Sequence, residues 1–154
     1  LLSPAALLAR INRELVHRIP TNAFVTMFWA EYDSHSRMLN WCNAGHCPAL
    51  LLSGGRETWL SASGIPVGLL DRTNYCDEQV RLPEGSVLVA YTDGIPEAER
   101  LDGEAFGEER LSAICRSQEA EEPGVLIEKI VESVEDWAGA AEQHDDLTLL
   151  VLRT

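Results

Sequence analysis

The sequence predicts a single α+β domain, residues 1–154, in which helices pack on antiparallel β-sheet. Three observations support this fold class. Three segments carry apolar residues at helical spacing. Short β-rich segments separated by tight turns follow the first of them, which is typical of antiparallel hairpins. The order is therefore a helix, several strands, two helices and a final strand, and a length of 154 residues is that of one domain.

The first element expected is a helix over residues 4–19. Ser3 and Pro4 suit the N-cap and the first helical position. Pro20 ends the apolar stripe, which comprises Leu7, Leu8, Ile11, Leu15 and Ile19.

Four strands are expected next, over residues 24–32, 38–42, 49–52 and 57–60. The first two are joined by the turn 33–36, and Gly54-Gly55 turns the third into the fourth. Because each strand follows its neighbour closely, we expect a meander, and hence antiparallel sheet.

The rest of the chain is predicted to form three more strands and two helices. Spaced Gly and Pro over residues 64–69 indicate a loop or a short strand. The remaining elements expected are an exposed strand over 75–82, a buried strand over 86–91, helices over 106–116 and 125–137, and a buried strand over 147–152.

Composition excludes some classes of binding partner and indicates the cellular compartment. A net charge of −13 argues against surfaces for nucleic acid or anionic lipid and suits a protein that binds cations or a basic partner. No apolar stretch approaches the ~20 residues of a membrane-spanning helix, and a secretory signal is not expected. The four cysteines lack CxxC spacing, which is typical of reduced thiols. We therefore expect a cytoplasmic protein without a structural disulfide.

Two carboxylates stand where one buried strand is expected to end and another to begin. Asp93 lies in Tyr91-Thr92-Asp93-Gly94, and Asp145 opens Asp145-Asp146-Leu147-Thr148. If the two strands are antiparallel neighbours, the carboxylates meet, and hard oxygen ligands of this kind favour Mg²⁺ or Mn²⁺. The alternative is that both residues are ordinary turn residues, because Asp favours turns.

A second candidate is the segment Asn43-Ala44-Gly45-His46, which follows an expected strand. His46 would serve there as a phosphate contact or proton donor. The alternative is a tight turn held by a hydrogen-bonded Asn43. The acidic runs 97–99, 108–109 and 119–122 are interpreted as solvated faces.

Taken in order, six motifs resemble the metal-dependent protein serine/threonine phosphatases (PPM, type 2C-like), and most of all their bacterial SpoIIE/RsbU-like branch. The motifs are Phe24-Val25-Thr26-Met27-Phe28, Asn43-Ala44-Gly45-His46-Cys47-Pro48, Gly64-Ile65-Pro66-Val67-Gly68, Tyr91-Thr92-Asp93-Gly94-Ile95-Pro96-Glu97-Ala98, Phe106-Gly107-Glu108-Glu109-Arg110-Leu111 and Asp145-Asp146-Leu147-Thr148-Leu149-Leu150. They span nearly the whole chain, which makes the set more specific than any one motif.

The resemblance implies an antiparallel β-sandwich flanked by helices, with two Mn²⁺ or Mg²⁺ ions and a metal-activated water that attacks a phosphoserine or phosphothreonine. It implies that Asp93 and Asp145 are metal ligands. Gly94, Asp146 and Asn43 would support the ligands without binding metal, and His46 is a weaker candidate for a catalytic role.

The family pattern begins with a strand that carries a metal-bridging Asp, followed by a second acidic strand and a first helix, and none of these is present here. The chain also lacks an initiator Met. We therefore expect a domain truncated at its N-terminus, which binds one ion or none and turns over poorly. Strands left without neighbours would have open edges through which two copies could form a homodimer.

The resemblance further implies a substrate, a phosphoserine on an anti-sigma-factor antagonist protein. The alternative function is a non-catalytic phosphatase-like module that binds a signalling partner. A third hypothesis, which rests only on the charge of −13, is an acidic cation-binding or interaction domain.

Overall fold

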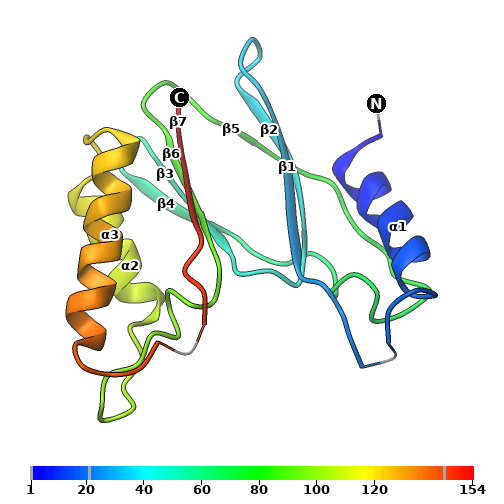
Figure 1. Ribbon diagram of the computed structural model, residues 1–154. Coiled ribbons are helices and arrows are strands. Elements are labelled where there is room, and N and C mark those ends of the chain that lie inside the picture. Colours follow the sequence, from blue (N-terminus) through cyan, green and yellow to red (C-terminus); the bar gives the residue numbers. More distant parts are fainter. Residues whose placement is uncertain (1, 21, 144) are drawn as a thin grey trace. The chain divides into compact units, whose positions relative to one another are not determined.

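The computed structural model describes residues 2–20, 22–143 and 145–154. Within them the chain forms three helices and seven strands, and the strands make two antiparallel sheets (Figure 1). The α+β fold class is therefore confirmed. The chain divides into two compact units, residues 1–48 with 60–83 and residues 49–59 with 84–154. In the described residues no helix is long and apolar enough to cross a membrane.

The first unit consists of helix α1 (Pro4–Leu15) and a sheet of order β1-β2-β5. The strands are β1 (Met27–Asp33), β2 (Met38–Ala44) and β5 (Glu78–Arg81). α1 packs against β1 and β2 (Figure 1). Leu8 of its apolar stripe is buried there, in a core with Ala5, Cys42, Ala44 and Val67, and Ile11 and Leu15 are partly buried against this core.

The start of α1 is capped by two side chains. Ser3 Oγ accepts a hydrogen bond from the Ala6 N–H at 3.3 Å, and Asp77 Oδ1 accepts one from the Ala5 N–H at 2.7 Å. The helix ends at Leu15, earlier than the predicted Ile19. The N–H of Arg18 and the N–H of Ile19 both bond to Leu15 O, so the chain tightens into a turn before Pro20, which disfavours helical geometry at Ile19.

Asn12 is a buried polar residue on α1, with 2% of its surface exposed. Its Nδ2 donates to Leu70 O at 2.9 Å, and its Oδ1 accepts from the Gly68 N–H at 2.7 Å. Gly68 has φ +86°, and a Cβ there would lie 2.5 Å from Ile19 Cδ1. Asn12 therefore ties residues 68–71 to the helix.

The second unit is a sheet of order β4-β3-β6-β7 whose one face is covered by two helices (Figure 1). The strands are β3 (Ala49–Ser53), β4 (Arg56–Leu60), β6 (Val87–Tyr91) and β7 (Leu149–Arg153), and the helices are α2 (Gly107–Ser117) and α3 (Pro123–Ala138). The fully buried side chains of this unit include Leu50, Val89, Leu111, Leu126 and Ile130.

The predicted meander is wrong at its middle. Both hairpins form, but β2 pairs with β5, whereas β3 pairs with β6, so the two hairpins belong to different sheets. The chain leaves the first sheet at residues 45–48, where Gly45 has φ +71°. β3 cannot pair with β2, because one edge of β2 is occupied by β1 and the other by β5 and Gly64.

The last strand is less buried than its apolar sequence predicts. β7 is Leu149–Arg153, and Leu150 is 57% exposed. β7 lies at the edge of its sheet, where it pairs with β6 but has no second neighbour among the described residues. An apolar run can therefore be an edge strand as well as a central one.

All four cysteines are free thiols. Cys42 and Cys115 are buried and Cys76 is exposed. Burial raises the pKa of the Cys115 thiol to about 12.

Substitution of Asn12 by Ala should lower the free energy of unfolding by about 2–3 kcal/mol, because it leaves the buried Gly68 N–H without its acceptor. Urea denaturation measures the change. Arg13→Ala, on the exposed side of the same helix, is the matched control and should change the value by less than about 0.5 kcal/mol. Equal effects of the two substitutions would contradict this account of Asn12.

Alkylation by iodoacetamide at pH 8 should modify Cys76 first and Cys115 only when the chain unfolds, because the thiolate is the nucleophile and Cys115 is buried. Mass spectrometry identifies the modified thiols. Rapid modification of Cys115 in the folded protein would contradict its burial.

The pKa of Cys115 is raised above the unfolded value of 9.0 to about 12, so deprotonation favours the unfolded state. The contribution of this thiol to the free energy of unfolding should therefore fall as the pH rises from 9 to about 12, which urea denaturation at several pH values measures.

Candidate metal centre

The two acidic motifs meet at one end of the β6–β7 pair. The strands are antiparallel, and Tyr91 lies opposite Leu149. The ladder continues one step further, because the Thr92 N–H donates to Thr148 O at 3.1 Å. The turn after β6 and the segment before β7 are therefore side by side, as the sequence predicted for antiparallel neighbours.

The Thr92 hydroxyl joins the two segments. Its Oγ1 donates to Asp146 O at 3.0 Å and accepts a hydrogen bond from the Thr148 N–H, also at 3.0 Å. One side chain thus satisfies a donor and an acceptor of the opposite backbone. This bond pair fixes the position of the segment that carries Asp145 and Asp146.

Gly94 lets the two backbones approach closely. A Cβ at this position would lie 2.5 Å from Asp146 O and 3.4 Å from Asp145 O, and these neighbours are backbone atoms that cannot rotate away. Any larger residue would push the segments apart. Gly94 therefore supports the candidate site through its lack of a side chain.

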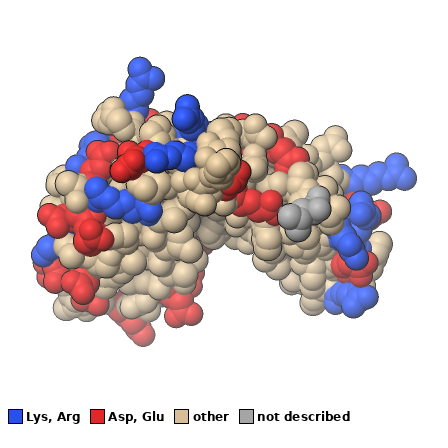
Figure 2. Space-filling view, turned by 90° about the horizontal axis from the view of Figure 1, so that it is seen from above, with Lys and Arg blue, Asp and Glu red and all other residues tan. Residues whose placement is uncertain are grey.

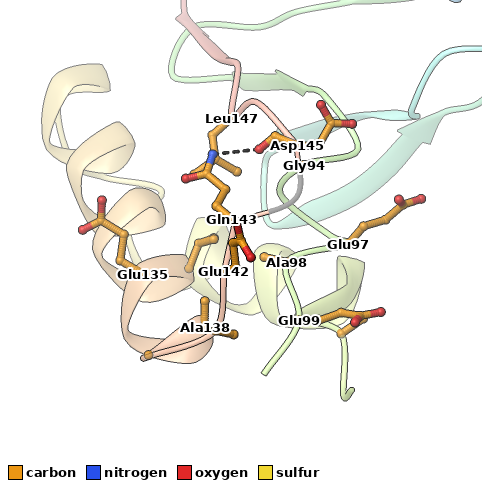
Figure 3. Close-up of a pocket in the computed structure, with 14 residues that line it drawn as sticks. Gly94, Glu97, Ala98, Glu99, Glu135, Ala138, Glu142, Gln143, Asp145 and Leu147 are labelled. Atoms are coloured by element: carbon orange, nitrogen blue, oxygen red, sulfur yellow. Dashed lines mark hydrogen bonds between the residues drawn. The ribbon is translucent and has the colours of Figure 1, made fainter. Parts of the chain in front are cut away.

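Asp93, Asp145 and Asp146 are all exposed. Asp145 Oδ1 accepts a hydrogen bond from the Asp146 N–H at 2.7 Å, and Gln143 Nε2 donates to Asp145 O at 2.7 Å (Figure 3). Asp93 O accepts from the Glu97 N–H at 2.9 Å, which closes the turn after β6. No group of three or more His, Cys, Asp or Glu is placed to hold a metal among the described residues, so the candidate rests on the two aspartates of the motifs.

Asn43 and His46 belong to the first unit, whereas Asp93 and Asp145 belong to the second. Asn43 is fully buried, and its side chain bonds the backbone of its own turn, with the His46 N–H donating to Asn43 Oδ1 at 2.8 Å. Asn43 Nδ2 also donates to Leu60 O at 3.2 Å. This is the hydrogen-bonded turn that was the alternative interpretation. The His46 ring contacts Thr26, with 3.0 Å between Nδ1 and Oγ1.

A pocket of about 460 Å³ opens beside Asp145 and Gly94. Figure 3 shows Glu97 and Glu99 on one side of it and Glu135 and Ala138 of α3 on the other. The sequence assigned the run 97–99 to a solvated face. It gave no signal for the pocket, because the lining comes from segments that only the fold brings together.

The charge is distributed unevenly along the chain. The first unit contains six Asp and Glu and six Lys and Arg, whereas the second contains nineteen Asp and Glu and six Lys and Arg. The net charge of −13 therefore belongs to the unit that carries the candidate site. Figure 2 shows one face of the molecule, on which acidic and basic side chains are interspersed.

Substitution of Gly94 by Ala should destabilise the protein by about 1–3 kcal/mol and weaken Mn²⁺ binding, because the new Cβ displaces the Asp145–Asp146 backbone. Denaturation and calorimetry measure the two effects. Gly124→Ala is the matched control. It has open space around its Cβ position and lies in α3, so it should be neutral or stabilise by about 0.4–1 kcal/mol. If Gly94→Ala behaves like this control, the close approach does not position the site.

Comparison with protein families and curated proteins identifies proteins that are similar to this chain. A family model described as Stage II sporulation protein E (SpoIIE) matches residues 1–154. The chain is 29% identical over 162 residues to phosphoserine phosphatase RsbU of Bacillus subtilis (strain 168), which covers 97% of this chain and 45% of that protein. It is 27% identical over 130 residues to protein IcfG of Synechocystis sp., covering 84% of this chain and 20% of that protein. The chain thus spans less than half the length of these relatives.

Solved structures share the fold. The SiaA-PP2C domain of Pseudomonas aeruginosa has a TM-score of 0.88 at 21% identity, with 99% of this chain and 61% of that chain covered. The PP2C phosphatase domain of SpoIIE from Bacillus subtilis, with a fragment of its regulatory domain, has a TM-score of 0.84 at 18% identity, with 99% of this chain and 44% of that chain covered. At these identities the likeness concerns the fold.

The family match covers the whole chain, and the structural likeness covers nearly all of it. Both agree with the resemblance carried by the six sequence motifs. The chain therefore belongs to the Stage II sporulation protein E (SpoIIE) family.

Proposed function

We propose that this chain is a metal-dependent protein serine/threonine phosphatase domain that hydrolyses phosphoserine on a regulatory protein. The observation that carries the proposal is the juxtaposition of Thr92-Asp93-Gly94 with Asp145-Asp146 by the pairing of β6 with β7. Membership of the SpoIIE family and the similarity to a protein named phosphoserine phosphatase support the same activity.

The proposed cofactor is Mn²⁺ or Mg²⁺, held by Asp93 and Asp145. The donor type fits, because both are exposed carboxylates on touching segments and these ions prefer hard oxygen ligands. Among the structural neighbours, one SpoIIE phosphatase domain is described as Mn presoaked, and RsbX is described as a complex with magnesium. Such an ion, when bound, activates water and neutralises charge on phosphoryl oxygens.

The chain's own contribution is to hold the carboxylates. The Thr92 hydroxyl fixes the segment before β7, and the Asp146 N–H orients the Asp145 carboxylate by bonding its Oδ1. The backbone of Asp146 takes part in both contacts, which supports a role for this residue in positioning the ligand Asp145 without binding the metal itself. His46 stays a weaker candidate for a phosphate contact, and Asn43 would act only by shaping the His46 turn.

The proposed substrate is a phosphorylated anti-sigma-factor antagonist, as the family resemblance implies, and the proposed compartment is the cytoplasm. A second copy of the chain is a further proposed partner. β1 and β7 each end their sheet among the described residues, and Leu150 on β7 is 57% exposed. Open strand edges of this kind favour pairing with another chain.

Asp93→Asn and Asp145→Asn should each weaken Mn²⁺ binding to the full-length protein by at least about tenfold and abolish hydrolysis of a phosphoserine peptide. Asn removes the charge but keeps the shape, and at position 145 it keeps an acceptor for the Asp146 N–H. Titration calorimetry and phosphate release measure the two effects. Chelation by EDTA should stop the reaction, and added Mn²⁺ should restore it.

The matched control is Asp136→Asn, an exposed aspartate on α3, which should leave both properties unchanged. Hydrolysis that persists in both site variants would show that the ligands are assigned wrongly. A folded parent protein that binds no Mn²⁺ and releases no phosphate would favour the alternative, a non-catalytic module that binds a signalling partner.

A further inference from the structure

The pocket beside the candidate metal centre is well placed to bind part of a substrate. It lies within the second unit, between the turn after β6, the C-terminal end of α3 and the segment before β7. Asp145 and Gly94 line one end of it. A phosphoserine at the proposed centre would therefore have its neighbouring residues over this pocket, whose volume of about 460 Å³ lies within the range of ligand sites.

The lining combines small apolar side chains with carboxylates. The apolar part consists of Ala98, Ala105, Val134, Ala138, Ala141 and Leu147. The acidic residues along it are Glu97, Glu99, Glu135 and Glu142, together with Asp145. The carboxylates of Glu97, Glu99 and Glu135 extend outward at the rim of the pocket (Figure 3). No Lys or Arg is among the described residues that line it. Lys and Arg side chains match such a surface, because their aliphatic stems pack on apolar atoms while the charged ends remain near water and carboxylates.

The four glutamates along the pocket, Glu97, Glu99, Glu135 and Glu142, have no ion-pair partner among the described residues. The two arginines closest in sequence to the pocket wall are engaged elsewhere. Arg100 pairs with Asp102 at 2.7 Å and Arg110 pairs with Glu104 at 2.6 Å. The negative charge of the pocket is therefore available to a ligand.

The same arginines make one wall of the pocket rigid. Their guanidinium carbons lie 4.9 Å (Arg100) and 3.7 Å (Arg110) from the centre of the Trp137 ring, a cation–π arrangement. Trp137 Nε1 donates to Glu104 O at 3.2 Å, and Glu99 and Ala105 form a bridge. The segment 99–105, which supplies Glu99 and Ala105 to the lining, is thus clamped to α3. A wall fixed in advance reduces the entropy lost when a ligand binds.

We infer that this pocket binds a lysine or arginine side chain of the phosphoprotein substrate, next to the phosphoserine. The inference rests on the proposed function and adds a sequence preference to it. The aliphatic stem would lie on the small apolar side chains of the pocket, and the cationic end would emerge at its rim, on the side of Glu97 and Glu99 (Figure 3). The excess of negative charge in the second unit favours the approach of such a basic segment.

The test compares phosphoserine peptides that carry a single Lys at each position near the phosphoserine with peptides that carry norleucine there. Norleucine keeps the stem and removes the charge. With the full-length protein and Mn²⁺, kcat/KM for the best Lys peptide should exceed that of its norleucine partner by about tenfold, the sum of two or three exposed ion pairs. The ratio should fall as salt is added, because salt screens exposed charges.

The variant Glu97→Gln/Glu99→Gln should reduce this ratio to about twofold or less. Glu121→Gln/Glu122→Gln is the matched control. Both residues are exposed and lie in the same unit, and the double substitution removes the same amount of charge. It should keep the ratio of the parent protein. An equal kcat/KM for Lys and norleucine peptides, or a ratio that the Glu97→Gln/Glu99→Gln variant leaves unchanged, would overturn the inference.

A second measurement separates this inference from the proposed function. Binding of unphosphorylated Lys and norleucine peptides to the full-length protein in EDTA is measured by fluorescence anisotropy, so neither metal nor turnover is needed. Tighter binding of the Lys peptide that depends on Glu97 and Glu99, without any phosphatase activity, would support the pocket and refute the phosphatase. Phosphatase activity without a Lys preference in either assay would refute the pocket and support the phosphatase.

Discussion

The pairing of β6 with β7 is the constraint on which the candidate site depends. Its register places Tyr91 opposite Leu149, so the residues just beyond both strands must run side by side. The Thr92 hydroxyl then bonds both to Asp146 O and to the Thr148 N–H, and Gly94 leaves room for the opposite backbone. Asp93 and Asp145, which lie about a third of the sequence apart, are thereby held on touching segments.

The buried polar side chains of the first unit have a structural role of the same kind. Asn12 bonds the 68–71 loop and Asn43 bonds its own turn, and each satisfies backbone groups that would otherwise be buried without partners. In the second unit, Arg100 and Arg110 stack on Trp137 and hold the 99–105 segment against α3. Because Arg100 and Arg110 pair with Asp102 and Glu104, they do not neutralise the acidic side chains of the pocket.

The chain passes from one sheet to the other and back, so both sheets contain strands that are not consecutive in sequence. Residues 45–48 carry the chain from β2 to β3, and residues 60–83 bring it back to pair β5 with β2 before β6 returns to β3. Each sheet is therefore assembled from strands distant in sequence. This arrangement is what places the segment after β6 next to a strand at the end of the chain.

The sequence by itself determined the elements, the fold class and the motif pair of Asp93 and Asp145, because helical and alternating periodicity and the turn residues are local properties. It also determined that these aspartates meet if their strands are antiparallel neighbours. Only the tertiary structure decided that they are neighbours, that β2 and β3 belong to different sheets and that the apolar β7 is an edge strand. Strand order depends on contacts between distant residues, which periodicity does not encode. For the same reason the pocket of Glu97, Glu99 and Ala138 became visible only when the fold had brought its walls together.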